Sequence, residues 1–292
     1  MAFSPKRLEQ LSKLGLLEDP FTTSADPRFM YLSEQHAQVM HEVRDLVEAF
    51  RGLAVVEGSL GVGKSTIARS LDNIYRDQPD AYRVVYVHSA GWESEYAGLL
   101  EITSALKLPR RKGSTAQWNE LDALLVEEHR RGRNVVLILD DGQLMAPRSM
   151  RLIHRLYNFD LQRKLAQIVV FGQPEIRYLF DAHPEVRSRV DSWLEIQPLD
   201  LPDTAKLILH RCRVAGRETT IVSRDGVVDV YGASRGVPRE IVSVCSKLVE
   251  TMVSRGETKV ASEASISEAV AIYKRTRVSP PPPAERETET EA

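Results

Sequence analysis

Eight residues, Gly58-Ser59-Leu60-Gly61-Val62-Gly63-Lys64-Ser65, combine glycines with a lysine and a hydroxyl at a spacing that suits phosphate binding. In this G-x-x-x-x-G-K-[ST] pattern, the glycines let successive backbone N–H groups turn toward an anion. Lys64 can reach the β- and γ-phosphates of a nucleotide, and the Ser65 hydroxyl suits Mg²⁺. The sequence therefore predicts a phosphate-binding P-loop over residues 58–65, with Thr66 next to it.

The residues on either side of the loop support this interpretation. Residues 53–57 predict a buried strand, and residues 66–71 open a helix whose N-terminus attracts phosphate. The alternative is a glycine-rich turn that only joins a strand to a helix, and the order of strand, loop, Lys-Ser and helix argues against it. The G-x-G-x-x-G order of dinucleotide-binding folds is absent. We predict that the chain binds a nucleoside triphosphate.

A pair of carboxylates follows a second apolar run. Residues 135–139 predict a buried strand, and Asp140 and Asp141 come directly after it. Ligands of open α/β sheets bind at this end of the strands. Asp140 is predicted to hold Mg²⁺ through its water shell, and Asp141 to orient the attacking water. The alternative is that two acidic residues merely end a strand in a solvated turn.

Composition sets broad limits on the class of protein. The chain has 292 residues, of which 42% are hydrophobic and 27% charged, and its net charge of −2 provides no global attraction to nucleic acid or membrane. No apolar run approaches about 18 residues, and the N-terminus lacks the apolar segment of a signal peptide. Cys212 and Cys245 are expected to be reduced core residues. We therefore expect a cytoplasmic protein without direct membrane insertion.

Strands and helices alternate along most of the chain. This alternation predicts an α/β fold, in which a parallel sheet is covered by helices on both faces. The strands are predicted at 53–57, 83–87, 135–139, 166–171 and 193–196. The helices are predicted at 34–50, 66–71, 96–108, 116–131 and 148–160, followed by 203–215, 225–231, 238–254 and 262–274.

These elements divide into four parts. Residues 1–33 contain two Asp-Pro pairs among apolar residues and predict an N-terminal strap packed on a domain. Residues 34–197 are the predicted α/β core, and residues 198–276 the small all-α lid. Residues 277–292 are rich in proline and glutamate and are expected to be a disordered acidic tail.

Several further stretches occur together with the P-loop in this order. They are residues 16–21, 26–33, 140–143, 172–175 and 236–239. With this set the chain resembles the AAA+ ATPases, and among them the ExeA/GspA-type family and the transposition-regulator ATPases of the TnsC, TniB and MuB kind. The resemblance spans residues ~14 to ~275. It implies an ATP hydrolase with ATP and Mg²⁺ as cofactors.

The resemblance also implies roles for single residues. Arg239, in Gly-Val-Pro-Arg, matches the sensor-2 arginine that contacts the γ-phosphate, and Gln173 takes the place of the sensor-1 polar residue. Arg187 and Arg189 lie where such families carry an arginine finger that acts on the neighbouring subunit, and the choice between them stays open. Tyr31 lies in the segment that resembles the lining of the adenine pocket.

One position departs from the family pattern. These families usually have Asp-Glu where this chain has Asp140-Asp141. Aspartate is one methylene shorter, which reduces its reach by roughly 1.5 Å. A misplacement of about 1 Å at a reacting centre can cost ~10²-fold in rate. We therefore predict slow hydrolysis and an ATP-gated switch.

The purpose of the ATP is less well defined by the sequence. The resemblance implies a homo-oligomer, either a ring or a filament. One hypothesis is a regulator on double-stranded DNA, in which a basic loop contacts phosphates without sequence specificity. That loop carries Lys107, Arg110, Arg111 and Lys112, with Arg130, Arg131 and Arg133 as further cations. Alternatively, the loop is only a solvated surface.

The second hypothesis is an ATPase of a secretion or envelope-assembly system that works with a membrane partner. A small-molecule kinase is disfavoured, because it would not explain the Gly-Val-Pro-Arg element or the predicted lid. Residues 1–13 and the acidic tail are candidate segments for binding an unidentified protein partner.

Overall fold

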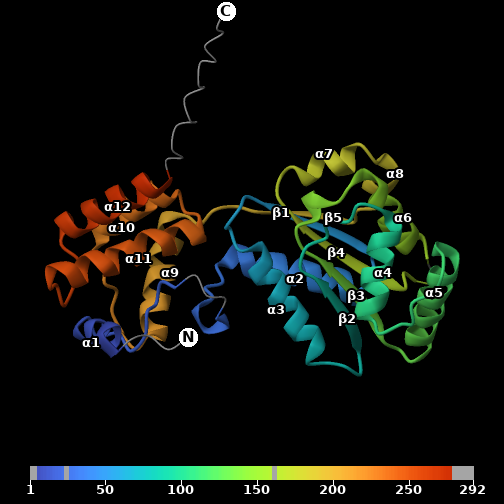
Figure 1. Cartoon of the computed structure of the whole chain (residues 1–292), viewed down its shortest axis with the longest axis horizontal. Coiled ribbons are helices and arrows are strands. Elements are labelled where there is room, and N and C mark those ends of the chain that lie inside the picture. Colours follow the sequence, from blue (N-terminus) through green and yellow to red (C-terminus); the bar gives the residue numbers. More distant parts are fainter. Residues whose placement is uncertain (1–4, 23–25, 160–162, 278–292) are drawn as a thin grey trace, which may run out of the picture. The chain divides into compact units, whose positions relative to one another are not determined.

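The computed structural model describes residues 5–22, 26–159 and 163–277. The chain divides into two compact units (Figure 1). The core unit comprises Ala25–Leu199 together with Val237–Arg239, and the helical unit comprises Met1–Ser24, Asp200–Gly236 and Glu240–Ala292. The core unit contains the predicted P-loop and both predicted carboxylates.

The core unit is built on a parallel sheet of five strands. The order β2-β3-β4-β1-β5 brings the carboxyl ends of β1, β3 and β4 together, since β1 lies directly beside β4 and β4 beside β3. Every residue of β1, β3 and β4 is buried, as expected for strands covered on both faces. The strands are β1 (Leu53–Gly58), β2 (Tyr82–Val87), β3 (Asn134–Leu139), β4 (Ala166–Gly172) and β5 (Ser192–Ile196).

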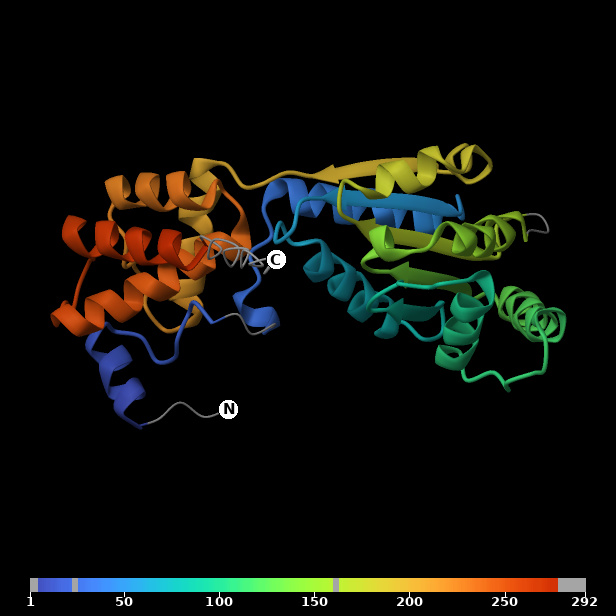
Figure 2. The same cartoon turned by 45° about the horizontal axis from the view of Figure 1, so that its top comes forward.

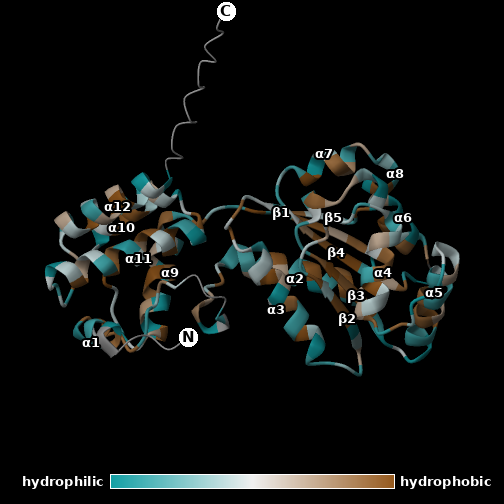
Figure 3. Ribbon diagram, in the orientation of Figure 1, coloured by the Kyte–Doolittle hydropathy of each residue, from teal (hydrophilic) through white to brown (hydrophobic). Residues whose placement is uncertain are grey.

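Helices cover both faces of this sheet, and successive strand residues alternate between the two faces (Figure 2). Val55 packs in a cluster with α4, α5 and α6, whereas Val56 packs in a cluster with α2 and α3. Figure 3 shows the strands as the most hydrophobic part of this unit. The helices are α2 (Glu34–Glu48), α3 (Lys64–Arg76), α4 (Glu95–Ala105), α5 (Ser114–Arg130), α6 (Met150–Asn158), α7 (Ile176–Asp181) and α8 (Pro184–Arg187). The predicted α/β class is confirmed.

Short elements account for the differences from the predicted core. Helices α7 and α8 have six and four residues, too few for a helical repeat of apolar residues to be recognised in the sequence. The helix predicted from 148 begins at Met150, because Pro147–Ser149 forms a 3₁₀ turn, η3. Two more 3₁₀ turns, η1 (Pro27–Phe29) and η2 (Gly142–Leu144), complete this unit.

The helical unit consists of amphipathic helices with polar caps. Asp200 caps α9 by accepting a hydrogen bond from the Asp203 amide at 2.7 Å, and Ser223 caps α10 through the Gly226 amide at 3.1 Å. Burial raises the pKa of the thiols of Cys212 and Cys245, which are both free. The helices are α1 (Pro5–Lys13), α9 (Leu201–Val214), α10 (Arg224–Ser234), α11 (Pro238–Arg255) and α12 (Glu263–Arg277).

The N-terminal segment differs from the single strap expected for residues 1–33. It contains a helix, α1, and it is divided between the units at residues 24 and 25. The division follows from hydrogen bonds within the helical unit: the Leu17 amide donates to the Ala215 carbonyl at 2.8 Å, and the Arg211 guanidinium to the Pro20 carbonyl at 2.7 Å. The predicted disordered tail lies outside the described residues, apart from Arg277.

The close packing around Gly142, just after β3, can be tested by substitution. A Cβ atom at this position would lie 2.4 Å from Val170 Cγ1 of β4 and 3.0 Å from Ile176 Cδ1. We expect Gly142→Ala to lower the free energy of unfolding by about 1–3 kcal/mol, because a methyl group would overpack a buried site. Gly91→Ala is the control, since its nearest neighbour, Leu144 Cβ, lies 3.7 Å away. Equal stability of both variants in urea unfolding would contradict this packing.

Candidate nucleotide site

The predicted P-loop connects the end of β1 to the start of α3. Gly61 and Gly63 have left-handed backbone conformations, with φ of +86° and +114°, which favour glycine. A Cβ atom at Gly63 would lie 2.9 Å from His36 Nε2, so the loop is packed closely on its support. No side chain caps α3, which leaves amides at the helix start for an anion.

Lys64 is buried at the first position of α3, with 6% of its surface exposed. Its Nζ donates hydrogen bonds to the carbonyls of Gly58 at 2.7 Å and Ser59 at 2.9 Å. Burial lowers the pKa of Lys64, and the carboxylates of Asp140, Asp141 and Glu175 oppose this shift. The structure thus brings the predicted phosphate ligand and the predicted carboxylate pair into one electrostatic environment.

Asp140 follows the last residue of β3 and is 3% exposed. The Tyr86 hydroxyl donates to its Oδ2 at 3.1 Å, and the Asp141 amide donates to its Oδ1 at 3.0 Å. Burial, and then the negative charge of Asp140, raise the pKa of Tyr86, so the phenol stays protonated as a donor. These bonds fix the orientation of the carboxylate.

Asp141 has a left-handed backbone, with φ of +52°, which is uncommon outside glycine. Its Oδ1 accepts a hydrogen bond from Gln143 Nε2 at 3.1 Å, and Gln143 Oε1 accepts one from the Gln173 amide at 3.0 Å. Gln143 therefore joins the predicted water-orienting carboxylate to the loop after β4. The Gln173 side chain has no hydrogen bond to any of the residues described.

Arg239 lies beside the P-loop in the segment Val237–Arg239, which groups with the core unit. Its amide donates to the Gly61 carbonyl at 3.2 Å, and a Cβ atom at Gly61 would lie 2.9 Å from Arg239 Cβ. Its positive charge contributes to the lowered pKa of Lys64. The predicted sensor-2 arginine is thus close to the predicted phosphate site.

Arg187 and Arg189 contact other parts of the core unit. The Arg187 guanidinium lies 4.2 Å from the centre of the Trp193 ring and 3.6 Å from Asp181, whereas that of Arg189 lies 5.8 Å from the Tyr157 ring. Neither has a recorded contact with residues 58–65 in the described part of the chain. The structure therefore does not show which of the two matches the predicted arginine finger.

His36 supports the P-loop from α2 and was not identified from the sequence. The side chain is 3% exposed, and its Nε2 lies 2.9 Å from the Val62 carbonyl. Because a carbonyl only accepts, Nε2 carries the proton, and Nδ1 can then accept from the Ser33 hydroxyl at 2.6 Å. The sequence did indicate that His36 is buried, since it continues the apolar row of Val39 and Val43 on one face of α2. Tyr31, which is predicted to line the adenine pocket, is half-buried and lies shortly before Ser33, the N-cap residue of α2.

A buried carboxylate immediately before the loop was also missed. Glu57 is 2% exposed at the end of β1, and both of its oxygens accept hydrogen bonds of 2.8 Å from Arg177 Nε. This pair connects β1 to α7, whose Arg177 guanidinium also lies 5.6 Å from the centre of the Trp193 ring. A buried carboxylate requires a charged partner such as Arg177. Arg177 is far from Glu57 in the sequence, so no local pattern indicated this pair.

The residues present fit a bound magnesium nucleotide. The Ser65 side chain is exposed and has no hydrogen bond within residues 5–22, 26–159 and 163–277, and Asp140 adds a second oxygen donor. The described residues contain no cluster of three His, Cys, Asp or Glu side chains suited to a metal. Mg²⁺ commonly takes one or two protein oxygens together with water and substrate phosphates, so this donor set is sufficient.

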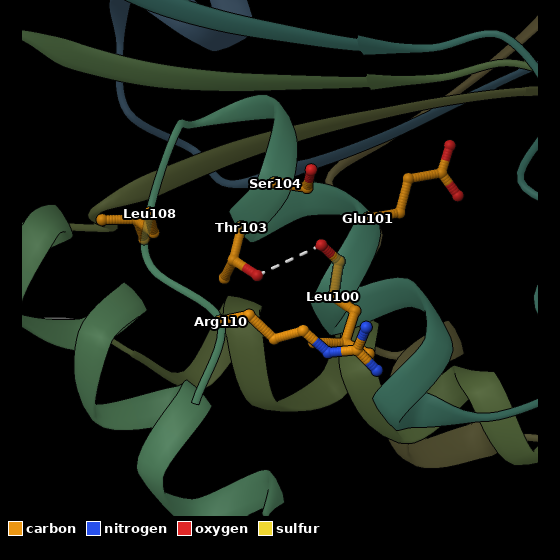
Figure 4. Close-up of a pocket in the computed structure, with 6 residues that line it drawn as sticks. All are labelled: Leu100, Glu101, Thr103, Ser104, Leu108 and Arg110. Carbon is orange, nitrogen blue, oxygen red and sulfur yellow. Dashed lines mark hydrogen bonds between the residues drawn. The ribbon is translucent and has the colours of Figure 1, made fainter. Parts of the chain in front are cut away.

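The basic loop lies between α4 and α5. Arg111 of this loop forms an ion pair, because its Nε lies 2.8 Å from the carboxylate of Glu120 on α5. Lys107, Arg110 and Lys112 are exposed and form no ion pair within the described residues. Arg110 borders a hollow of about 330 Å³ that it shares with Leu100, Glu101, Thr103, Ser104 and Leu108 (Figure 4).

Residues 48–180 match the family described as AAA domain. The sheet order, the loop before α3 and the carboxylates after β3 occupy this same region. Nearly half of the chain thus matches the AAA domain family, in agreement with the predicted resemblance to the AAA+ ATPases.

Over 252 residues the chain is 25% identical to General secretion pathway protein A of Aeromonas hydrophila. The match covers 84% of this chain and 45% of that protein, so the chain spans less than half the length of this relative. The predicted resemblance to the ExeA/GspA-type family is confirmed.

Solved structures show the same fold at low sequence identity. The ORC2 protein of Aeropyrum pernix, in ADPNP–ADP complexes, has a TM-score of 0.65 and 14% identity, covering 90% of this chain and 73% of that one. The ORC1 protein of the same organism, in complex with DNA, has a TM-score of 0.62 and 17% identity, covering 88% and 69%. Among the described residues, no helix is long and apolar enough to cross a membrane.

His36→Ala tests the support of the P-loop. We expect it to raise the Kd of a fluorescent ATP analogue about fivefold, because one hydrogen bond worth about 1 kcal/mol is lost. His41→Ala on the same helix is the matched control, since His41 is exposed and lies 3.4 Å from Asp45, away from the P-loop contact of His36. Titrations at constant Mg²⁺ measure both variants, and equal affinities would show that His36 does not position the loop.

Proposed function

We propose that the chain binds and hydrolyses ATP, and that the bound nucleotide controls assembly into a homo-oligomer, a ring or a filament, that acts on double-stranded DNA. One observation carries the ATPase part of the proposal. A buried lysine lies at the start of α3, beside the carboxylates that follow β3 and beside Arg239.

Each residue of this site has a proposed task. The amides of the loop over Gly58–Ser65 hold the phosphates, and Lys64 moves its ammonium from the loop carbonyls to the β- and γ-phosphates. Ser65 and Asp140 would hold Mg²⁺, which neutralises phosphate charge when bound. Asp141 orients water for attack, and Arg239 contacts the γ-phosphate. Gln173 and one of Arg187 and Arg189 are proposed to complete the catalytic set.

Slow hydrolysis remains part of the proposal. Asp141 is shorter than the usual glutamate, and its carboxylate is held by a hydrogen bond from the Gln143 side chain at 3.1 Å. Both features limit how far it reaches toward a water at the γ-phosphate.

Asp141→Glu tests this limit. We expect kcat for phosphate release to rise, by up to ~10²-fold if reach alone limits the rate, while KM changes little. Asp141→Asn should lower kcat, because the amide cannot accept a proton from water. An unchanged kcat in the glutamate variant would contradict the geometric explanation.

Two observations support DNA as the partner. Lys107, Arg110 and Lys112 present three exposed positive charges from one loop, which suits contacts to phosphates without sequence reading. In addition, a structure of similar fold, ORC1 of Aeropyrum pernix, was solved in complex with DNA. Regulation of transposition is a proposal that rests on the sequence resemblance alone.

The second candidate function is an ATPase of a secretion or envelope-assembly system. The relative named General secretion pathway protein A favours it, although this chain spans 45% of that relative. In this case the partner would be a membrane protein, and the basic loop would be a solvated surface.

DNA binding separates the two candidates. We expect a labelled random-sequence duplex to bind in the presence of a non-hydrolysable ATP analogue, more weakly with ADP, and with a steep dependence on salt. Changing Lys107, Arg110 and Lys112 to Glu should reduce the affinity at least tenfold.

The control for this triple variant changes three exposed cations of the helical unit, Arg224, Lys259 and Lys274, to Glu. Fluorescence anisotropy measures each affinity, and light scattering measures the oligomer mass in the same nucleotide states. No binding in any nucleotide state would contradict the DNA proposal and favour the secretion-type function.

A further inference from the structure

A second hollow in the core unit lies among elements that the nucleotide site does not use. It has a volume of about 690 Å³ and is bordered by the starts of α4 and α5, by η3 and α6, and by residues around α8. Its lining includes Ser94, Tyr96, Ser114, Arg148 and Arg151. Polar and charged side chains dominate this lining, so the hollow suits a charged ligand.

Two arginines and two glutamates line this hollow, so its formal charges balance. Arg148 and Arg151 are exposed, and neither has an ion pair or a hydrogen bond within the described residues. The two carboxylates of the lining already have partners: Glu95 accepts from Trp118 Nε1 at 3.0 Å, and Glu185 lies 3.2 Å from His183 Nδ1. Among the charged side chains of the lining, the two guanidinium groups are therefore the ones that have no side-chain partner within the described residues.

The starts of two helices supply further hydrogen-bond donors to this hollow. Ser94 accepts a hydrogen bond from the Ala97 amide at 3.2 Å, which leaves its own hydroxyl proton available to a ligand. Helix α5, of 17 residues, begins at Ser114 after Gly113 and has no side-chain cap, so amides of its first turn can donate to an anion. Each feature favours a group with several acceptor oxygens, such as a phosphate.

The hollow lies next to the basic loop. The Tyr96 hydroxyl in its lining donates to the Arg111 carbonyl at 3.3 Å, and Ser114 directly follows the loop. Arg110, from the same loop, borders the other hollow, against α4 (Figure 4). One small anion could occupy only one of these hollows, whereas a chain of phosphates can contact cations in both.

We propose that Arg148 and Arg151 bind the phosphate backbone of a nucleic acid and extend the basic loop into one continuous contact surface. This inference rests on the proposed function on DNA and assigns to it two residues that the motif set does not include. Phosphate contacts carry no sequence information, so binding through this surface is insensitive to base sequence.

The test compares Arg148→Ala/Arg151→Ala with the wild-type chain on the same random-sequence duplex, with the non-hydrolysable ATP analogue. Each phosphate contact contributes about 0.9 to the slope of log affinity against log salt, so the slope should fall by about two. The affinity at low salt should drop at least tenfold. Arg224→Ala/Lys259→Ala removes two exposed cations from the helical unit as the control, and it should match the wild type.

The outcomes separate this inference from the proposed function. If the loop variant loses DNA binding while Arg148→Ala/Arg151→Ala keeps the wild-type slope and affinity, the inference is wrong and the function on DNA stands. If the wild-type chain binds no DNA, both are wrong. Calorimetry with pyrophosphate completes the test. If pyrophosphate binds the wild type but not Arg148→Ala/Arg151→Ala, while the variant keeps the wild-type affinity for DNA, the hollow binds a small anion and the inference is wrong.

Discussion

A buried ammonium group at the tip of a parallel sheet is the constraint on which the rest of the structure depends. Lys64 is removed from water at the first turn of α3, and the carboxylates of Asp140 and Asp141 oppose the resulting loss of basicity. This balance requires β1 and β3 to end at the same edge, which the strand order achieves with β4 between them. The glycines, the helix start and Arg239 are arranged around that charge.

Much of the fold could be predicted because parallel strands that are covered on both faces are apolar along their whole length. The five strands and the long helices carry this signal within single stretches of chain. Helices α7 and α8 are too short to show a periodicity. The pairing of residues before 25 with α9 and its C-terminus depends on contacts such as Leu17 to Ala215, which join distant parts of the sequence.

Some residues of the candidate nucleotide site could likewise be predicted from the sequence, and others could not. Gly58–Ser65 and Asp140-Asp141 could be proposed from the sequence because each motif is contiguous and follows a strand. His36 and Tyr86 act through hydrogen bonds to residues 26 and 54 positions away, and Gln143 joins Asp141 to the Gln173 amide. The sequence does not show these bonds, even though the position of His36 in an apolar row indicates that it is buried. The paired state of Arg111 was missed for the same reason, because Glu120 lies on the following helix.

The left-handed backbone of Asp141 favours a short side chain, whereas the proposed role of its carboxylate would favour a longer one. Aspartate and asparagine tolerate this conformation better than longer acids, since their short side chains can bond locally, as Asp141 does with Gln143. A glutamate would reach further but would adopt the left-handed backbone conformation less readily. Fold stability and a long-lived ATP-bound state would then favour the same residue, so selection for a persistent switch would also preserve the turn that follows β3.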